Sequence, residues 1–113
     1  MSTTDELLES ARELLTARTV PGWPRATAVL IRQALEAAVD GLWLQKEPQM
    51  VEARWRSKLI ALVDIVPARD AGMIRTLWAQ LSGACHVHEY ELPPTSGELR
   101  RWIEAVHGVV GRL

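Results

Sequence analysis

The sequence predicts an all-α protein: an antiparallel bundle of four to five helices that forms one domain over residues 1–113. Three observations indicate this class. Apolar residues recur with a helical period through almost the whole chain. Proline and glycine interrupt that pattern, and the short connections they leave favour antiparallel neighbours. No segment shows the strict apolar–polar alternation that is typical of a half-buried β-strand.

Two helices are expected before residue 46. The first covers residues 4–18, where Thr3 and Glu6 make a capping-box pair. Its apolar face consists of Leu7, Leu8, Ala11, Leu14 and Leu15. The segment TVPGWP breaks the chain, and Pro24 suits the first turn of a second helix over residues 24–45. The face of that helix consists of Ala28, Ile31, Leu35, Ala38, Val39 and Leu42.

The middle of the chain predicts two further helices. The third spans residues 50–66, and Pro67 ends it. Asp70 is a good N-cap for a fourth helix over residues 71–88. The apolar face of the third helix consists of Trp55, Leu59, Leu62 and Val66. The predicted face of the fourth helix consists of Ile74, Leu77, Leu81, Ala84 and His88.

The last helix follows the segment YELPP, in which Pro93 and Pro94 prevent the fourth helix from continuing. Thr95 and Glu98 make a second capping box at its start. Its apolar face consists of Leu99, Trp102, Ile103, Val106 and Val110.

Two glycines fall inside predicted helices, where glycine costs about 1 kcal/mol relative to alanine. They are Gly41 and Gly83. The structural interpretation is that another helix approaches closely at each position.

Composition and charge exclude several classes of protein. The apolar content of 48% excludes disorder, and the apolar runs are far shorter than the roughly 18 residues of a membrane span. The polar, acidic N-terminus excludes a signal peptide, so a cytoplasmic protein is expected. One cysteine allows no internal disulfide. The net charge of −1 gives no global attraction to nucleic acid or membrane, although 11 of the 13 basic residues are arginine.

The chemically richest stretch is CHVHEY, residues 85–90, and its residues allow three interpretations. As a metal site, Cys85, His88 and Glu89 would share one helical face, but no fourth ligand is evident, so no metal or cofactor is expected. As a nucleophile, Cys85 could not easily meet His86, because adjacent helical side chains point about 100° apart. As a structural element, His88 would close the apolar face while His86 points into solvent.

The same stretch resembles the HEPN superfamily, small all-α domains of toxin–antitoxin, phage-defence and other RNA-processing systems. Active members carry an arginine, four to six residues, then a histidine, and one toxin branch continues with any residue and a tyrosine. Here His88, Glu89 and Tyr90 match the second half, whereas Gly83 stands at the arginine position. The resemblance implies His88, His86 and Tyr90 as candidate catalytic residues.

Within that resemblance, histidine would act as the acid or base on the ribose 2′-hydroxyl, and arginine would hold the phosphate. Losing such a donor can lower the rate of the catalysed reaction by a factor on the order of 10²–10³. Catalysis is therefore expected to be weak or absent unless another arginine substitutes. Arg100 and Arg101 are the candidates for substrate binding, because they open the last helix.

Two functions remain open. The first is a degenerate or weak RNase, or an RNA-associated domain, of a bacterial toxin or defence system. The second is a non-enzymatic interaction or regulatory domain that binds a partner protein such as an antitoxin or effector. The resemblance implies a homodimer, and five tryptophans, more than a small core needs, favour an interface. Trp23 and Trp43, which flank chain breaks, are expected to be partly exposed.

Overall fold

The computed structural model describes residues 2–86 and 92–113, and those residues contain helices and no strand. The all-α prediction is confirmed. The α-helices are α1 (Thr3–Ala17), α2 (Trp23–Lys46), α3 (Trp55–Ala61), α4 (Ala68–Cys85) and α5 (Ser96–Gly111), with short 3₁₀ helices η1 (Pro48–Glu52) and η2 (Leu62–Asp64) on either side of α3.

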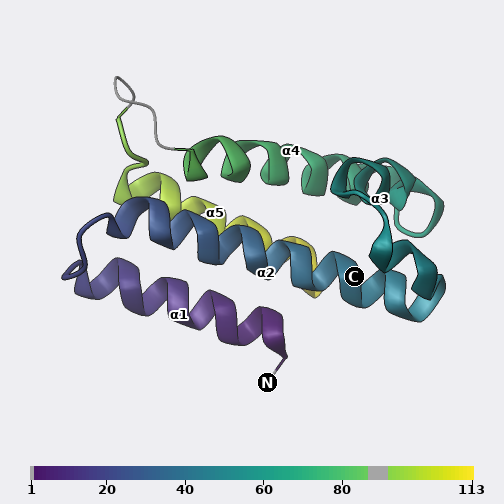
Figure 1. Ribbon diagram of the computed structural model, residues 1–113, viewed down its shortest axis with the longest axis horizontal. Coiled ribbons are helices and arrows are strands. Elements are labelled where there is room, and N and C mark those ends of the chain that lie inside the picture. Colours follow the sequence, from purple (N-terminus) through teal and green to yellow (C-terminus); the bar gives the residue numbers. More distant parts are fainter. Residues whose placement is uncertain (1, 87–91) are drawn as a thin grey trace.

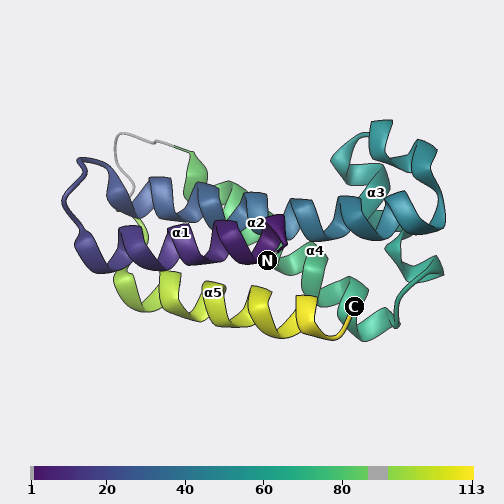
Figure 2. The ribbon, with the colours of Figure 1, turned by 90° about the horizontal axis from the view of Figure 1, so that it is seen from below.

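The four long helices run side by side in alternating directions, and α3 covers one end of the bundle (Figures 1 and 2). Helix α2 is central, because it contacts α1, α4, α5 and η1. Its buried face carries side chains that are almost completely covered, namely Thr27, Ala28, Ile31, Ala34, Leu35 and Val39. The opposite end of the bundle brings together the start of α2, the end of α4 and the start of α5 (Figure 1).

The start of α1 differs from the prediction. The N-cap is Ser2, which forms a capping box with Asp5, instead of Thr3 with Glu6. Tertiary structure explains the shift, because the hydroxyl of the buried Thr4 donates to the backbone carbonyl of Ala34 at 3.2 Å. Thr4 is thereby fixed within the first turn. The capping box of Thr95 and Glu98 at the start of α5 is confirmed.

The expected third helix over residues 50–66 is wrong, because three short elements replace it. The backbone is extended at Ala53 and Arg54, which separates η1 from α3. Contacts with α2 hold α3 in this position: the indole nitrogen of Trp43 donates to the carbonyl of Lys58 at 3.3 Å. These contacts between elements cannot be read from the apolar period alone.

Both ends of α4 also differ from the expected 71–88. The helix begins at Ala68, and Pro67 takes the N-cap position predicted for Asp70. Asp70 lies instead in the first turn and pairs with the Arg112 guanidinium at 3.0 Å, which joins α4 to the end of α5. The helix ends at Cys85, because His86 has extended backbone geometry.

The predicted close approach at Gly41 and Gly83 is wrong. A Cβ atom added at either glycine would meet nothing within 4 Å. Their cost to the helix is therefore not compensated by packing. We expect Gly41→Ala to raise the free energy of unfolding by about 1 kcal/mol, measured by urea denaturation.

Gly22 provides the matched control for Gly41→Ala. Its φ is +76°, so alanine would be strained there although the space around it is open. Gly22→Ala should therefore lower stability. Equal effects of the two substitutions would contradict this distinction.

The tryptophan side chains make their packing contacts and hydrogen bonds within a single chain. Trp43 is buried, which corrects the expectation that it is partly exposed, whereas Trp23 is half-buried beneath the Arg18 guanidinium. Trp55 lies under the Lys58 ammonium, and the indole nitrogen of Trp78 donates to Glu36. The number of tryptophans therefore no longer argues for an interface.

Candidate functional site

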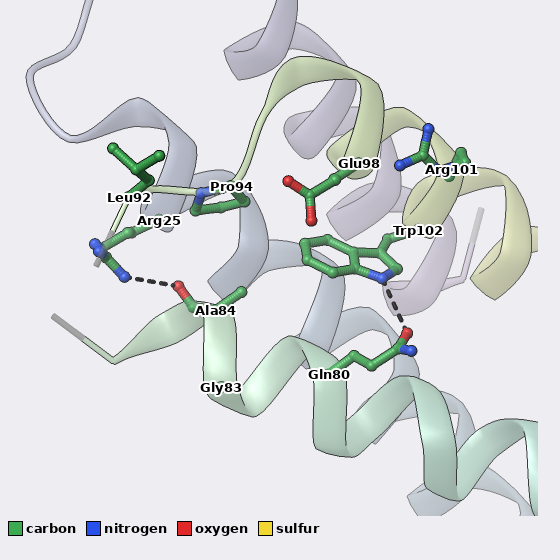
Figure 3. A pocket seen from close by; sticks show the side chains of 9 residues that line it. All are labelled: Arg25, Gln80, Gly83, Ala84, Leu92, Pro94, Glu98, Arg101 and Trp102. Carbon is green, nitrogen blue, oxygen red and sulfur yellow. Dashed lines mark hydrogen bonds between the residues drawn. The ribbon is translucent and has the colours of Figure 1, made fainter. Parts of the chain in front are cut away.

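A cavity with a volume of about 510 Å³ lies at the end of the bundle where α4 ends and α5 begins. Figure 3 shows the side chains that line it. This volume falls within the usual range for ligand pockets. Helices α2, α4 and α5 and the segment before α5 all contribute to it. Its lining consists of Arg25, Gln80, Gly83, Ala84, Leu92, Pro94, Glu98, Arg101 and Trp102.

Arg25 comes from the first turns of α2 and joins that helix to the end of α4. Its Nη1 donates to the carbonyl oxygen of Ala84 at 3.3 Å and also to that of His86. The last carbonyls of a helix have no partner inside the helix, and they carry its negative end charge. Arg25 therefore stabilises the C-terminus of α4 while it lines the cavity.

Trp102 forms the wall of the cavity on α5 (Figure 3). Its indole nitrogen donates to Oε1 of Gln80 at 3.2 Å, which ties α5 to α4 across the cavity. Glu98 lies one helical turn before Trp102, so both side chains are on the same face of α5. Its Oε1 accepts from the Thr95 amide and hydroxyl, each at 3.1 Å.

Arg101 and Arg100, the two predicted substrate-binding residues, face different cavities. Arg101 lines the cavity beside Trp102, opposite Arg25 in the view of Figure 3. Arg100 instead lines a separate hollow of about 320 Å³ with residues of α1, among them Arg12. Within residues 2–86 and 92–113, Arg101 has no hydrogen bond or ion pair.

Gly83 is exposed and belongs to the same cavity as Arg101 and Arg25. Residue 83 is therefore open to solvent and lines the same cavity as two arginines. A longer side chain at residue 83 would have room, because its Cβ would meet no atom within 4 Å.

The histidine-containing stretch is only partly covered by the structure. His86 is exposed, as expected, and its backbone carbonyl accepts from Arg25. His88 and Tyr90, the other two candidate catalytic residues, lie outside the described residues, as does Glu89. Because α4 ends at Cys85, no described helix carries the expected apolar face as far as residue 88.

Cys85 is half-buried between α4 and α2. Burial raises the pKa of its thiol, an effect that the positive charge of Arg32 partly opposes. The neutral thiol is therefore favoured near pH 7, which suits the position of Cys85 against the hydrophobic core. In the part of the chain that the structure describes, no group of three or more His, Cys, Asp or Glu side chains could hold a metal.

Sequence reasoning did not assign several of the lining residues to a site, among them Arg25 and Trp102. Arg25 directly follows the segment TVPGWP, which separates the first two helices. This position in the sequence indicates that Arg25 lies at an end of the bundle. Trp102 was assigned to the apolar face of the last helix, and only the packing of α5 on α4 turns part of it toward the cavity.

Comparisons with family models, curated proteins and solved structures found no match. Among the described helices, none has both the length and the apolar character needed to cross a membrane.

Proposed function

We propose that this chain is a HEPN-like RNA-associated domain with weak or degenerate RNase activity, acting as a homodimer in a toxin or defence system. One observation carries the proposal: Arg25 and Arg101 line the same cavity as Gly83, the position of the missing motif arginine. The cavity therefore retains positive charge at the place where the family would bind phosphate.

Arg101 is the side chain best suited to the phosphate. Its guanidinium is exposed, and its Nη1 lies 3.8 Å from the point where a Cβ of Gly97 would be, over the first turn of α5. Arginine presents a planar fork that matches two phosphate oxygens. Arg25 supports the site differently, because it already holds the end of α4 through two carbonyl oxygens.

The neighbouring arginines allow a matched test. We expect Arg101→Ala to weaken binding of a single-stranded RNA of about twelve nucleotides by about tenfold, the cost of one hydrogen bond to a charged group. Arg100→Ala removes the same charge on another face and should leave the affinity nearly unchanged. Fluorescence anisotropy at several salt concentrations measures both, and only Arg101→Ala should reduce the salt dependence.

Equal weakening by the two substitutions would contradict the proposal, because it would indicate general charge attraction. Absence of RNA binding by the native chain would also contradict it.

The second candidate function is a non-enzymatic interaction or regulatory domain. Three apolar side chains near the α3 end favour it, because they are largely exposed: Leu44 at 62%, Ile60 at 57% and Val63 at 48%. A chain of this kind would bind its partner protein without binding RNA. The Arg101→Ala experiment therefore separates the two functions.

A further inference from the structure

The wall of the cavity formed by α5 combines three kinds of side chain. Glu98 precedes Arg101 by three residues and Trp102 by four, so its carboxylate neighbours both the guanidinium and the indole, which themselves point about 100° apart. Phosphate binding needs only the guanidinium. The carboxylate and the aromatic ring have no part in the phosphate site proposed above. They therefore determine which other chemical groups the cavity can bind.

We propose that the cavity binds one unpaired nucleotide of single-stranded RNA, with guanine as the preferred base. This inference rests on the proposed function and names the substrate class of the same site. The base packs against the Trp102 ring, its hydrogen-bonding edge meets Glu98, and the adjoining phosphate meets Arg101.

Trp102 is suited to stacking because its position is fixed. Its hydrogen bond to Gln80 at 3.2 Å holds the indole, while part of the ring lines a cavity of about 510 Å³. Bases stack on aromatic side chains only when they are unpaired and splayed out of a strand. The cavity thus discriminates against duplex RNA.

Glu98 supplies the preference for guanine. A carboxylate only accepts hydrogen bonds, and guanine presents two adjacent donors, N1–H and the 2-amino group, on its pairing edge. Oε1 of Glu98 already accepts from the Thr95 amide and hydroxyl, whereas Oε2 has no hydrogen bond to any residue that the structure describes, so the two lone pairs of Oε2 are left to accept both guanine donors. Uracil presents a single donor, N3–H, between two carbonyl oxygens that the carboxylate would repel, which disfavours it.

The experiment uses the full chain and single-stranded oligouridine of about eight nucleotides with one central G, A, C or U. The strand with G should bind most tightly, and the same strand in a duplex should bind at least about tenfold more weakly. Binding is measured by anisotropy and by quenching of tryptophan fluorescence.

Three variants test the roles separately. Trp102→Leu should weaken binding of the G strand about tenfold, whereas Trp102→Phe should retain most of it. Both lose the hydrogen bond to Gln80, so their difference isolates the aromatic ring. Glu98→Gln keeps the capping box, because glutamine also serves at that position, and it should abolish the preference for G.

Equal binding of the four strands, or equal loss with leucine and phenylalanine, would overturn this inference. The proposed function would still stand if Arg101→Ala weakened binding. Binding of free GMP as tightly as the G strand would contradict the assignment to RNA.

Discussion

Gly83→Arg is expected to raise RNA cleavage by about 10²–10³-fold over the native chain, because it restores the cation that stabilises charge on the phosphate in the transition state. The substitution should fold. Gly83 is exposed in α4, and a Cβ there meets no atom within 4 Å. Cleavage is measured on labelled single-stranded RNA in the presence of a chelator, since no metal is invoked.

Two controls separate chemistry from helix stability. Gly83→Ala gains helix propensity, about 1 kcal/mol, without the guanidinium, so it should leave cleavage unchanged. Gly83→Arg combined with His88→Ala should lose the gained activity, because His88 is the proposed acid or base. Binding without any gain in cleavage would remove the catalytic part of the proposal and leave RNA association.

Asp40→Ala is expected to lower the free energy of unfolding by about 3 kcal/mol, the low end for breaking a buried ion pair. Nζ of Lys58 lies 2.8 Å from Oδ1 of Asp40, and the side chain of Lys58 is only 5% exposed. Removing the carboxylate leaves a buried ammonium without its ion-pair partner. The cost stays at the low end because Asp40 is 34% exposed and the Trp55 ring still lies under the ammonium.

Lys58→Met is the matched control for Asp40→Ala. It removes the buried charge and leaves a carboxylate that water can reach, so it should be the milder change. Combining the two substitutions should recover part of the stability lost in Asp40→Ala. Urea denaturation measures all three variants, and a double variant less stable than Asp40→Ala alone would contradict this account.

The sequence by itself determined the fold class and most of the core. The helical recurrence of apolar residues placed Ile31, Leu35, Ile74, Leu81 and Val106 on buried faces, and all five are fully buried. The capping box of Thr95 and Glu98 was also readable, because its two hydrogen bonds join residues three apart. Such features are local, so neighbours along the chain carry their physical cause.

The tertiary structure decided the helix ends and the composition of the candidate site. Thr4 shifted the start of α1 through a hydrogen bond to Ala34, thirty residues away. The division between Arg100 and Arg101 depends on how α5 rotates against α1 and α4, which periodicity does not fix. Arg25 reaches the cavity only because α2 begins where α4 ends, and contacts of this kind exist only after the chain has packed.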